Sequence, residues 1–324
     1  MRSLNIENIQ LAANALIGNA VTTPLLESPK LNSELGCRLL VKAECLQRTG
    51  SFKFRGAYTK ISRIPQPARA RGLVAFSSGN HAQGVAATAG IFGCPATIIM
   101  PESAPEMKVN NTRAYGAKVQ TYDILTQNRE QLGRDLAETT GAVLVKPYDD
   151  PDIIAGQGTA GLEIGQQLDA LGLSPDLLLC PCGGGGLIAG VSIAVHDHFP
   201  CTSIYAVEPD NFDDTRRSLQ SGERETNQAG FSSICDAIIT PTPGELTFAI
   251  NQKHLSAGLT VDDASVLRAM KIAFEYFKIV VEPGGVVALA AALEGKVDVT
   301  NKCVVVVCSG GNVDPLQFQA CLNS

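Results

Sequence analysis

SFKFRGA, at residues 51–57, is the stretch around which the rest of the sequence is organised. Lys53 stands between two phenylalanines, follows a polar turn at residues 47–50 and precedes a helical start expected at Gly56. Burial disfavours the ammonium form and lowers the pKa of a lysine. Lys53 is therefore a candidate nucleophile for a carbonyl group, as a Schiff base requires. An ordinary lysine, with its stem on apolar neighbours and its head in water, fits the same seven residues, so the decision depends on the rest of the chain.

The composition of the 324 residues excludes several classes of protein. Hydrophobic residues make up 45%, and no apolar run is long enough to span a membrane, so we expect a well-cored protein with no membrane partner. The net charge of -6 leaves no basic stripe for nucleic acid, which favours a small-molecule ligand. The cysteines lie mostly in apolar runs and are expected to be reduced thiols. Because no secretory signal is visible, we expect a cytoplasmic location.

Short apolar runs alternate with helix-like segments along most of the chain. The runs cover residues 39–45, 73–76, 96–100, 119–122, 143–145, 177–180, 204–207 and 303–307. Helices are expected to begin near residues 56, 80, 105, 126, 155, 186, 261 and 283. This alternation predicts an α/β fold with mostly parallel sheet and covering helices, and the turn PYDDP at 147–151 is the candidate domain boundary.

The first of three glycine loops is Ser77-Ser78-Gly79-Asn80-His81, directly after the run that ends at Phe76. Hydroxyls, an amide and a helix N-terminus together suit a carboxylate. The alternative is an ordinary strand-to-helix turn in which serine and asparagine cap the helix. Taken alone, His81 is more typical of a structural histidine than of an acid or base.

The second loop is Gly183-Gly184-Gly185-Gly186, between a strong strand and a strong helix. Successive backbone N–H groups there can converge on one anion, and the helix dipole favours a phosphate. A rival interpretation uses Gly184, Gly186 and Ala189 as a dinucleotide fingerprint, with Glu208 as the ribose-binding acid. An NAD-dependent oxidoreductase is therefore the runner-up from a different class.

The third loop is Ser309-Gly310-Gly311-Asn312, after the run at 303–307. A serine at the end of a buried strand can hydrogen-bond a ring nitrogen, and glycines let a flat cofactor approach the backbone. A buried lysine, a phosphate loop, a carboxylate loop and this hydroxyl together favour a phosphorylated aldehyde cofactor, pyridoxal 5'-phosphate.

In these four ordered motifs the chain resembles the fold-type II pyridoxal-phosphate enzymes, and within them the serine/threonine dehydratase and serine racemase family. The match runs nearly end to end. It implies a tryptophan synthase β-like fold with two open, mostly parallel twisted sheets. It also implies a large cofactor-binding domain of residues 1–66 and 150–324, a small mobile substrate-binding domain of residues 67–149, and a homodimer.

The resemblance also implies a role for individual residues. Lys53 is the Schiff-base lysine and the general base, Phe52 and Asn80 contact the cofactor ring, and Ser309 meets its nitrogen. Gly183, Gly184, Gly185 and Gly186 hold the phosphate, and Ser77, Ser78, Gly79, Asn80 and His81 hold the substrate carboxylate. Ser78 is a second catalytic residue if it returns a proton on the face opposite Lys53. The loop Glu282-Pro283-Gly284-Gly285 departs from the family pattern in its glycines, which leaves the role of Glu282 open.

A metal site is suggested by the acidic segment EPDNFDD at 208–214. By the resemblance, Glu208, the Phe212 carbonyl and Asp214 bind Mg²⁺, or Ca²⁺ or Mn²⁺ in its place. Oxygen ligands of this kind suit hard cations. Composition alone favours a solvated acidic turn.

The function expected first is β-elimination of L-threonine or L-serine to a 2-oxo acid and ammonia. The close alternatives are a 3-hydroxyaspartate ammonia-lyase and a serine racemase. Arg129 resembles a position from which some relatives reach a distal carboxylate, although a solvated helix arginine is the commoner explanation. A non-catalytic amino-acid-binding module is the other class kept open.

Overall fold

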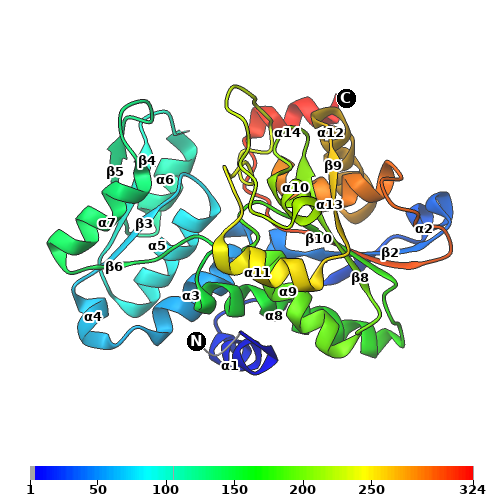
Figure 1. Cartoon of the computed structure of the whole chain (residues 1–324), viewed down its shortest axis with the longest axis horizontal. Helices are drawn as coiled ribbons and strands as arrows, with labels where there is room; N and C mark the ends of the chain where they lie inside the picture. The colour runs from blue at the N-terminus through cyan, green and yellow to red at the C-terminus, as the bar shows by residue number, and fades with distance from the viewer. Residues whose placement is uncertain (1–3, 105, 324) are drawn as a thin grey trace.

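The computed structural model describes residues 4–104 and 106–323 and contains two parallel-stranded sheets, each covered by helices (Figure 1). The larger sheet has the order β1-β2-β10-β7-β8-β9 and the smaller has the order β5-β4-β3-β6. Every neighbouring pair is parallel except β1 with β2. The predicted fold class is confirmed.

The strands of the larger sheet are β1 (Leu25–Glu27), β2 (Arg38–Ala43), β7 (Leu177–Pro181), β8 (Ser203–Pro209), β9 (Ala257–Val261) and β10 (Cys303–Cys308). Those of the smaller sheet are β3 (Leu73–Phe76), β4 (Ala96–Pro101), β5 (Lys118–Tyr122) and β6 (Val143–Leu144). The helices are α1 (Ile6–Leu16), α2 (Pro29–Leu35), α3 (Lys53–Arg63), α4 (Gln66–Ala70), α5 (Asn80–Phe92), α6 (Glu106–Ala114), α7 (Arg129–Thr140), α8 (Pro151–Leu171), α9 (Gly186–His198), α10 (Asp214–Ser221), α11 (Glu245–His254), α12 (Asp263–Ile272), α13 (Pro283–Leu293) and α14 (Pro315–Leu322).

The central strands of the larger sheet are buried on both faces, which is why their sequences are continuous apolar runs. Val304 and Val306 of β10 point to one face and pack with residues of α12 and α13. Val305 and Val307 point to the other face and pack with residues of α8 and α9. The sheet therefore holds its loops between two well-packed helical layers.

The smaller sheet is covered in the same way. Ala75 and Ile98 pack with residues of α3 and α5 on one face, and Phe76 and Ile99 pack with residues of α7 on the other. The sheet lies within residues 73–144, inside the predicted small domain, whose boundaries at 67 and 149 stay predictions.

Several helix starts differ from the predictions. The helix expected at Gly56 begins at Lys53, so the lysine itself opens α3. Asn128 and Asp150 each cap two backbone N–H groups, which sets the starts of α7 and α8 at residues 129 and 151 rather than 126 and 155. The helix expected near residue 261 begins at Asp263, because the preceding residues form β9. The expected start at 105 lies outside the described residues; α6 is described from Glu106.

Among the described helices, none combines the length and the apolar character that crossing a bilayer requires. The ten cysteines all lie within the described residues and none of them is bridged to another, and Cys201 is the exposed one. This agrees with the expectation of reduced cysteines.

Candidate active site

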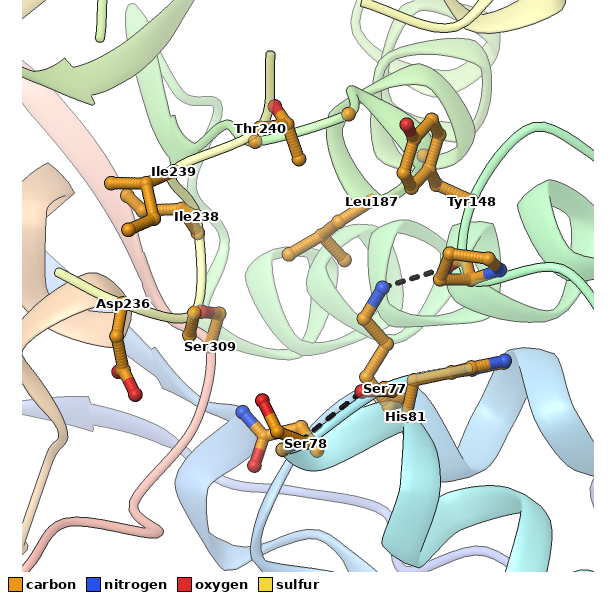
Figure 2. A pocket seen from close by; sticks show the side chains of 18 of the residues that line it. Ser77, Ser78, His81, Tyr148, Leu187, Asp236, Ile238, Ile239, Thr240 and Ser309 are labelled. Carbon is orange, nitrogen blue, oxygen red and sulfur yellow. Dashed lines mark hydrogen bonds between the residues drawn. The ribbon is translucent and has the colours of Figure 1, made fainter. Parts of the chain in front are cut away.

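The motif residues meet at the carboxyl ends of the strands, around one cavity (Figure 2). The loop after β3 supplies Ser77, Ser78 and His81, and the loop after β10 supplies Ser309. Figure 2 shows them on walls of the cavity across from Tyr148, Leu187 and Thr240. Open α/β sheets bind ligands at this edge, because the strand-to-helix loops gather there.

Lys53 lines this cavity as a half-buried side chain. Its Nζ donates a hydrogen bond to the Pro147 carbonyl at 2.6 Å and lies 5.1 Å from the centroid of the Phe52 ring. Burial lowers the pKa of Lys53 from 10.5 to about 8. The Phe52 N–H donates to the Ser309 carbonyl at 3.1 Å, which ties the start of α3 to the third loop. The predicted nucleophile is thus half-buried, held by a hydrogen bond, and easier to deprotonate than an ordinary lysine.

The loop Gly183–Gly186 lines the cavity and opens α9. Its Gly185 has φ +86° and provides no side-chain cap, so the first N–H groups of the helix are left for a ligand. A Cβ on Gly184 would lie 2.5 Å from the Tyr148 ring. The Gly184 carbonyl accepts a 2.7 Å hydrogen bond from the Thr247 hydroxyl, which fixes the loop. This geometry fits a bound phosphate.

The segment Ser77–His81 runs from the loop after β3 into the first two residues of α5, and Ser77, Ser78, Gly79 and Asn80 line the cavity. The N-cap position is Gly79 and no side chain caps the helix, so serine and asparagine do not cap it as the alternative interpretation required. The Ser77 hydroxyl accepts a 3.2 Å hydrogen bond from the Gly79 N–H instead. The end of the helix is open to an anionic group.

The His81 side chain has a structural role, since it bonds a backbone carbonyl. Its Nε2 lies 2.9 Å from the Val145 carbonyl, which can only accept, so Nε2 carries the proton. Burial, followed by the charge of Lys53, lowers the pKa of His81 to about 3. The ring is therefore neutral and offers no positive charge to a carboxylate.

Ser309 and Asn80 are buried residues that line the cavity, as does Glu282, whose role the sequence left open. The Glu282 Oε1 atom accepts a 2.5 Å hydrogen bond from Asn80 Nδ2. Burial raises the pKa of Glu282 from 4.5 to about 7.

The structure also adds residues that the sequence analysis missed. Tyr148 lies in the segment interpreted only as a domain break, and Asp236 lies in an irregular stretch without a pattern. Asp236 forms an ion pair across the cavity with Lys108 of α6. No local signal in the sequence pairs two residues so far apart.

Arg129 lines the same cavity from the first position of α7. Its guanidinium carbon lies 5.9 Å from the centroid of the Phe76 ring, and it makes no ion pair with any residue that the structure describes. A cation at a cavity wall without an anionic partner can bind a carboxylate of a ligand.

The predicted metal residues come together only in part. Glu208 is fully buried, and its two oxygens accept hydrogen bonds from the N–H groups of Thr215 and Arg216 at 2.9 and 2.8 Å. The nearby Asp214 accepts from Asn227 through Oδ1, while its buried Oδ2 has no partner. Across the described residues, no three His, Cys, Asp or Glu side chains are arranged to hold a metal. The metal site therefore stays a prediction.

The same contacts weigh against the dinucleotide interpretation. Because Glu208 is turned inward to hold the start of α10, its carboxylate is not presented to a ribose. The glycine loop faces a cavity that contains a half-buried lysine and a serine hydroxyl, which a dinucleotide site does not need.

The residues present fit pyridoxal phosphate. The cavity joins the Lys53 amine with its lowered pKa, two uncapped helix N-termini at Gly79 and Gly185, and the hydroxyl-bearing Ser309. Such a set binds an aldehyde, a phosphate, a carboxylate and a ring nitrogen.

Comparisons with known proteins agree that the site belongs to a pyridoxal-phosphate enzyme. Residues 18–310 match the family described as "Pyridoxal-phosphate dependent enzyme". The chain is 41% identical to an L-threo-3-hydroxyaspartate ammonia-lyase of Pseudomonas sp over 99% of both chains. It is also 41% identical to an L-threo-3-hydroxyaspartate ammonia-lyase of Saccharomyces cerevisiae, over 95% of this chain and 93% of that protein. The crystal structure of a T.th. threonine deaminase superposes with a TM-score of 0.91 and 42% identity, covering 96% of this chain and 99% of that chain. The protein belongs to the pyridoxal-phosphate dependent enzyme family of fold type II.

Proposed function

We propose that this enzyme is an ammonia-lyase that eliminates water from a 3-hydroxy amino acid with a second carboxylate, of the 3-hydroxyaspartate type. One water then hydrolyses the resulting imine and releases ammonia. The products are a 2-oxo acid and ammonia. The observation that carries the proposal is the unpaired guanidinium of Arg129 in a cavity that already offers a separate anion site at Ser77–His81.

Pyridoxal phosphate, when bound, supplies an aldehyde for the substrate amine and an electron-withdrawing ring. The chain's own residues hold it and the substrate. Gly183–Gly186 and the N-terminus of α9 suit the phosphate, and Ser309 suits the ring nitrogen. The N-terminus of α5 suits the α-carboxylate of the substrate.

Lys53 is the general base in this proposal. With a pKa of about 8, roughly a tenth of its amine is neutral at pH 7, and that fraction can accept the Cα proton. Ser78 lines the same cavity, and its return of a proton, which would give racemisation, stays a prediction.

The substrate preference is supported from two directions. Arg129 is free to pair with a distal carboxylate, whereas Lys108 is already paired with Asp236. Two relatives that cover nearly the whole chain are hydroxyaspartate ammonia-lyases. The second candidate substrates are L-threonine and L-serine, which the similarity to a threonine deaminase supports. For these, Arg129 would have no role in catalysis.

The reaction class is tested with Lys53→Ala. The variant should lose the visible absorbance of bound cofactor and all release of 2-oxo acid. Turnover retained by Lys53→Ala would overturn the proposal.

The substrate is tested by comparing kcat/KM for L-threo-3-hydroxyaspartate, L-threonine and L-serine in the wild type and in Arg129→Gln. We expect hydroxyaspartate to lead, and Arg129→Gln to lower its kcat/KM by tenfold or more, about 1.4 kcal/mol, with L-serine changed less than about threefold. The matched control is Arg134→Gln on the same helix, where the arginine is 55% exposed and lies 3.8 Å from Glu130. Equal losses for all three substrates would contradict the assignment of Arg129.

A further inference from the structure

Glu282 occupies the N-cap position of α13, yet it does not cap that helix. Its side chain turns toward α5, where Oε1 accepts the 2.5 Å hydrogen bond from Asn80 Nδ2. Only 4% of Glu282 is exposed. The Glu282 carboxyl leaves its own helix uncapped and bonds the start of α5 instead. Its position therefore does not serve the stability of α13.

The orientation of the Asn80 carboxamide follows from a chain of contacts that starts at a backbone carbonyl. The Thr49 carbonyl can only accept, so the atom of Asn312 that lies 2.8 Å away is Nδ2. The same Nδ2 donates to Asn80 Oδ1 at 2.7 Å. Asn80 must therefore present Nδ2 to Glu282, and one N–H of that amide group is left over.

The backbone around Glu282 leaves room for this contact. A Cβ on Gly310 would collide with the Glu282 carboxyl and lie 3.1 Å from Asn80 Nδ2. A Cβ on Gly285 would lie 3.2 Å from Glu282 Cγ. The Glu282 N–H also donates to the Gly310 carbonyl at 2.9 Å. One of the glycines at which this loop departs from the family pattern, Gly285, thus leaves space beside the Glu282 side chain.

We propose that Glu282 is a positioning residue that, together with Asn312, holds the Asn80 carboxamide in one orientation, with its remaining N–H available to the ring of bound pyridoxal phosphate. Asn80, Asn312 and Glu282 all line the cavity that contains Lys53. Glu282 acts only through Asn80, so it is not a catalytic residue. The inference rests on the cofactor of the family and not on the proposed substrate.

Two charged groups near Glu282 are Asp236, which raises the pKa of Glu282, and Lys108, which lowers it. These two side chains form an ion pair with each other, and neither takes the place of Glu282 as the hydrogen-bond acceptor for Asn80. The acceptor for Asn80 is therefore the Glu282 carboxyl itself, whether it is ionised or protonated.

The test compares Glu282→Gln with Glu282→Ala. Glutamine keeps an acceptor oxygen of similar reach, whereas alanine removes it. Cofactor-free protein is titrated with pyridoxal phosphate, and the dissociation constant and the visible absorbance maximum are measured. We expect Glu282→Gln to bind within about threefold of wild type, and Glu282→Ala to bind at least tenfold more weakly with a shifted maximum.

Asn312→Ala should weaken pyridoxal phosphate binding as much as Glu282→Ala does. The double variant should bind at most about threefold more weakly than either single variant, because both residues act on the same Asn80 carboxamide. Glu294→Gln, at the opposite end of α13 in an exposed ion pair with Arg268, is the control and should bind as wild type. Wild-type binding by Glu282→Ala would overturn the proposal. An equal loss of pyridoxal phosphate affinity in Glu282→Gln and Glu282→Ala would also overturn it. Circular dichroism must first show that Glu282→Ala is folded.

Discussion

Replacing Glu282 with glutamine should stabilise the cofactor-free protein, and the gain should grow with pH. Burial is the main reason that the pKa of Glu282 rises from 4.5 to about 7, with Asp236 raising it further and the Asn80 hydrogen bond and Lys108 lowering it. Between these two values the unfolded chain has lost the proton that the folded chain keeps. Folding must then take up a proton, so wild-type stability falls as pH rises through this window.

The size of the effect follows from the two pKa values. The difference between a pKa of 4.5 in the unfolded chain and about 7 in the folded chain corresponds to roughly 3 kcal/mol of wild-type stability. The wild type has this stability in full below pH 4.5 and has lost all of it above pH 7. Glutamine does not ionise, so Glu282→Gln should match the wild type near pH 4.5 and exceed it by roughly 3 kcal/mol at pH 8. For a chain of this length that corresponds to about 5 °C in Tm.

The assay is urea and thermal unfolding of the cofactor-free wild type, Glu282→Gln and Glu294→Gln at intervals from pH 4.5 to 8. Glu294→Gln makes the same glutamate-to-glutamine change at the other end of α13, where the side chain is 32% exposed, and serves as the control for the substitution itself. A Glu282→Gln advantage that is the same at pH 5 and pH 8 would refute the reasoning, because it would mean that Glu282 ionises alike in the folded and unfolded states.

Three further changes test other parts of the structure. Gly184→Ala should weaken pyridoxal phosphate binding by at least tenfold, measured by absorbance titration, because the new Cβ would lie 2.5 Å from the Tyr148 ring; unchanged affinity would show that the loop moves freely. Arg55→Met should lower the free energy of unfolding by about 3–5 kcal/mol in urea, since it leaves the fully buried Glu44 without its partner; a loss below about 1 kcal/mol would mean that the ion pair is dispensable. Mg²⁺ should raise the Tm of the wild type in a calorimeter but not that of Asp214→Asn, whose parent carboxylate has an unpartnered buried oxygen; equal shifts would reject the metal site.

The sequence was sufficient for those parts of the site that are carried by local patterns. A strand, a glycine loop and a helix N-terminus are adjacent in the chain, so Gly183–Gly186, Ser77–His81 and Ser309 could each be placed at the carboxyl end of a strand from sequence. That β3 belongs to a different sheet from β7 and β10, and that the two sheets share one cavity, came from the structure. The starts of α7 and α8 were misplaced because a single capping side chain, Asn128 or Asp150, overrides the apolar pattern.

Contacts between distant residues could not be predicted in this way. Glu282 and Asn80 are separated by 202 positions, and the hydrogen bond between them depends on how two sheets are placed relative to each other. The ion pair of Lys108 with Asp236 spans 128 positions for the same reason. Neither residue of such a pair carries a local sign of its partner.

The segment SFKFRGA at residues 51–57 combines a pattern that the sequence reveals with contacts that only the structure reveals. Lys53 was recognisable from its neighbours, but Arg55, two positions later, could not be given partners from sequence. The structure shows that Arg55 is 1% exposed and bonds Glu44 at the end of β2 and Glu163 in α8. Lys42 joins the same network through Glu163 at 2.6 Å. Because these contacts fix the first turn of α3 to the larger sheet, the position of the Lys53 amine in the cavity depends on a buried ion network that the motif alone does not reveal.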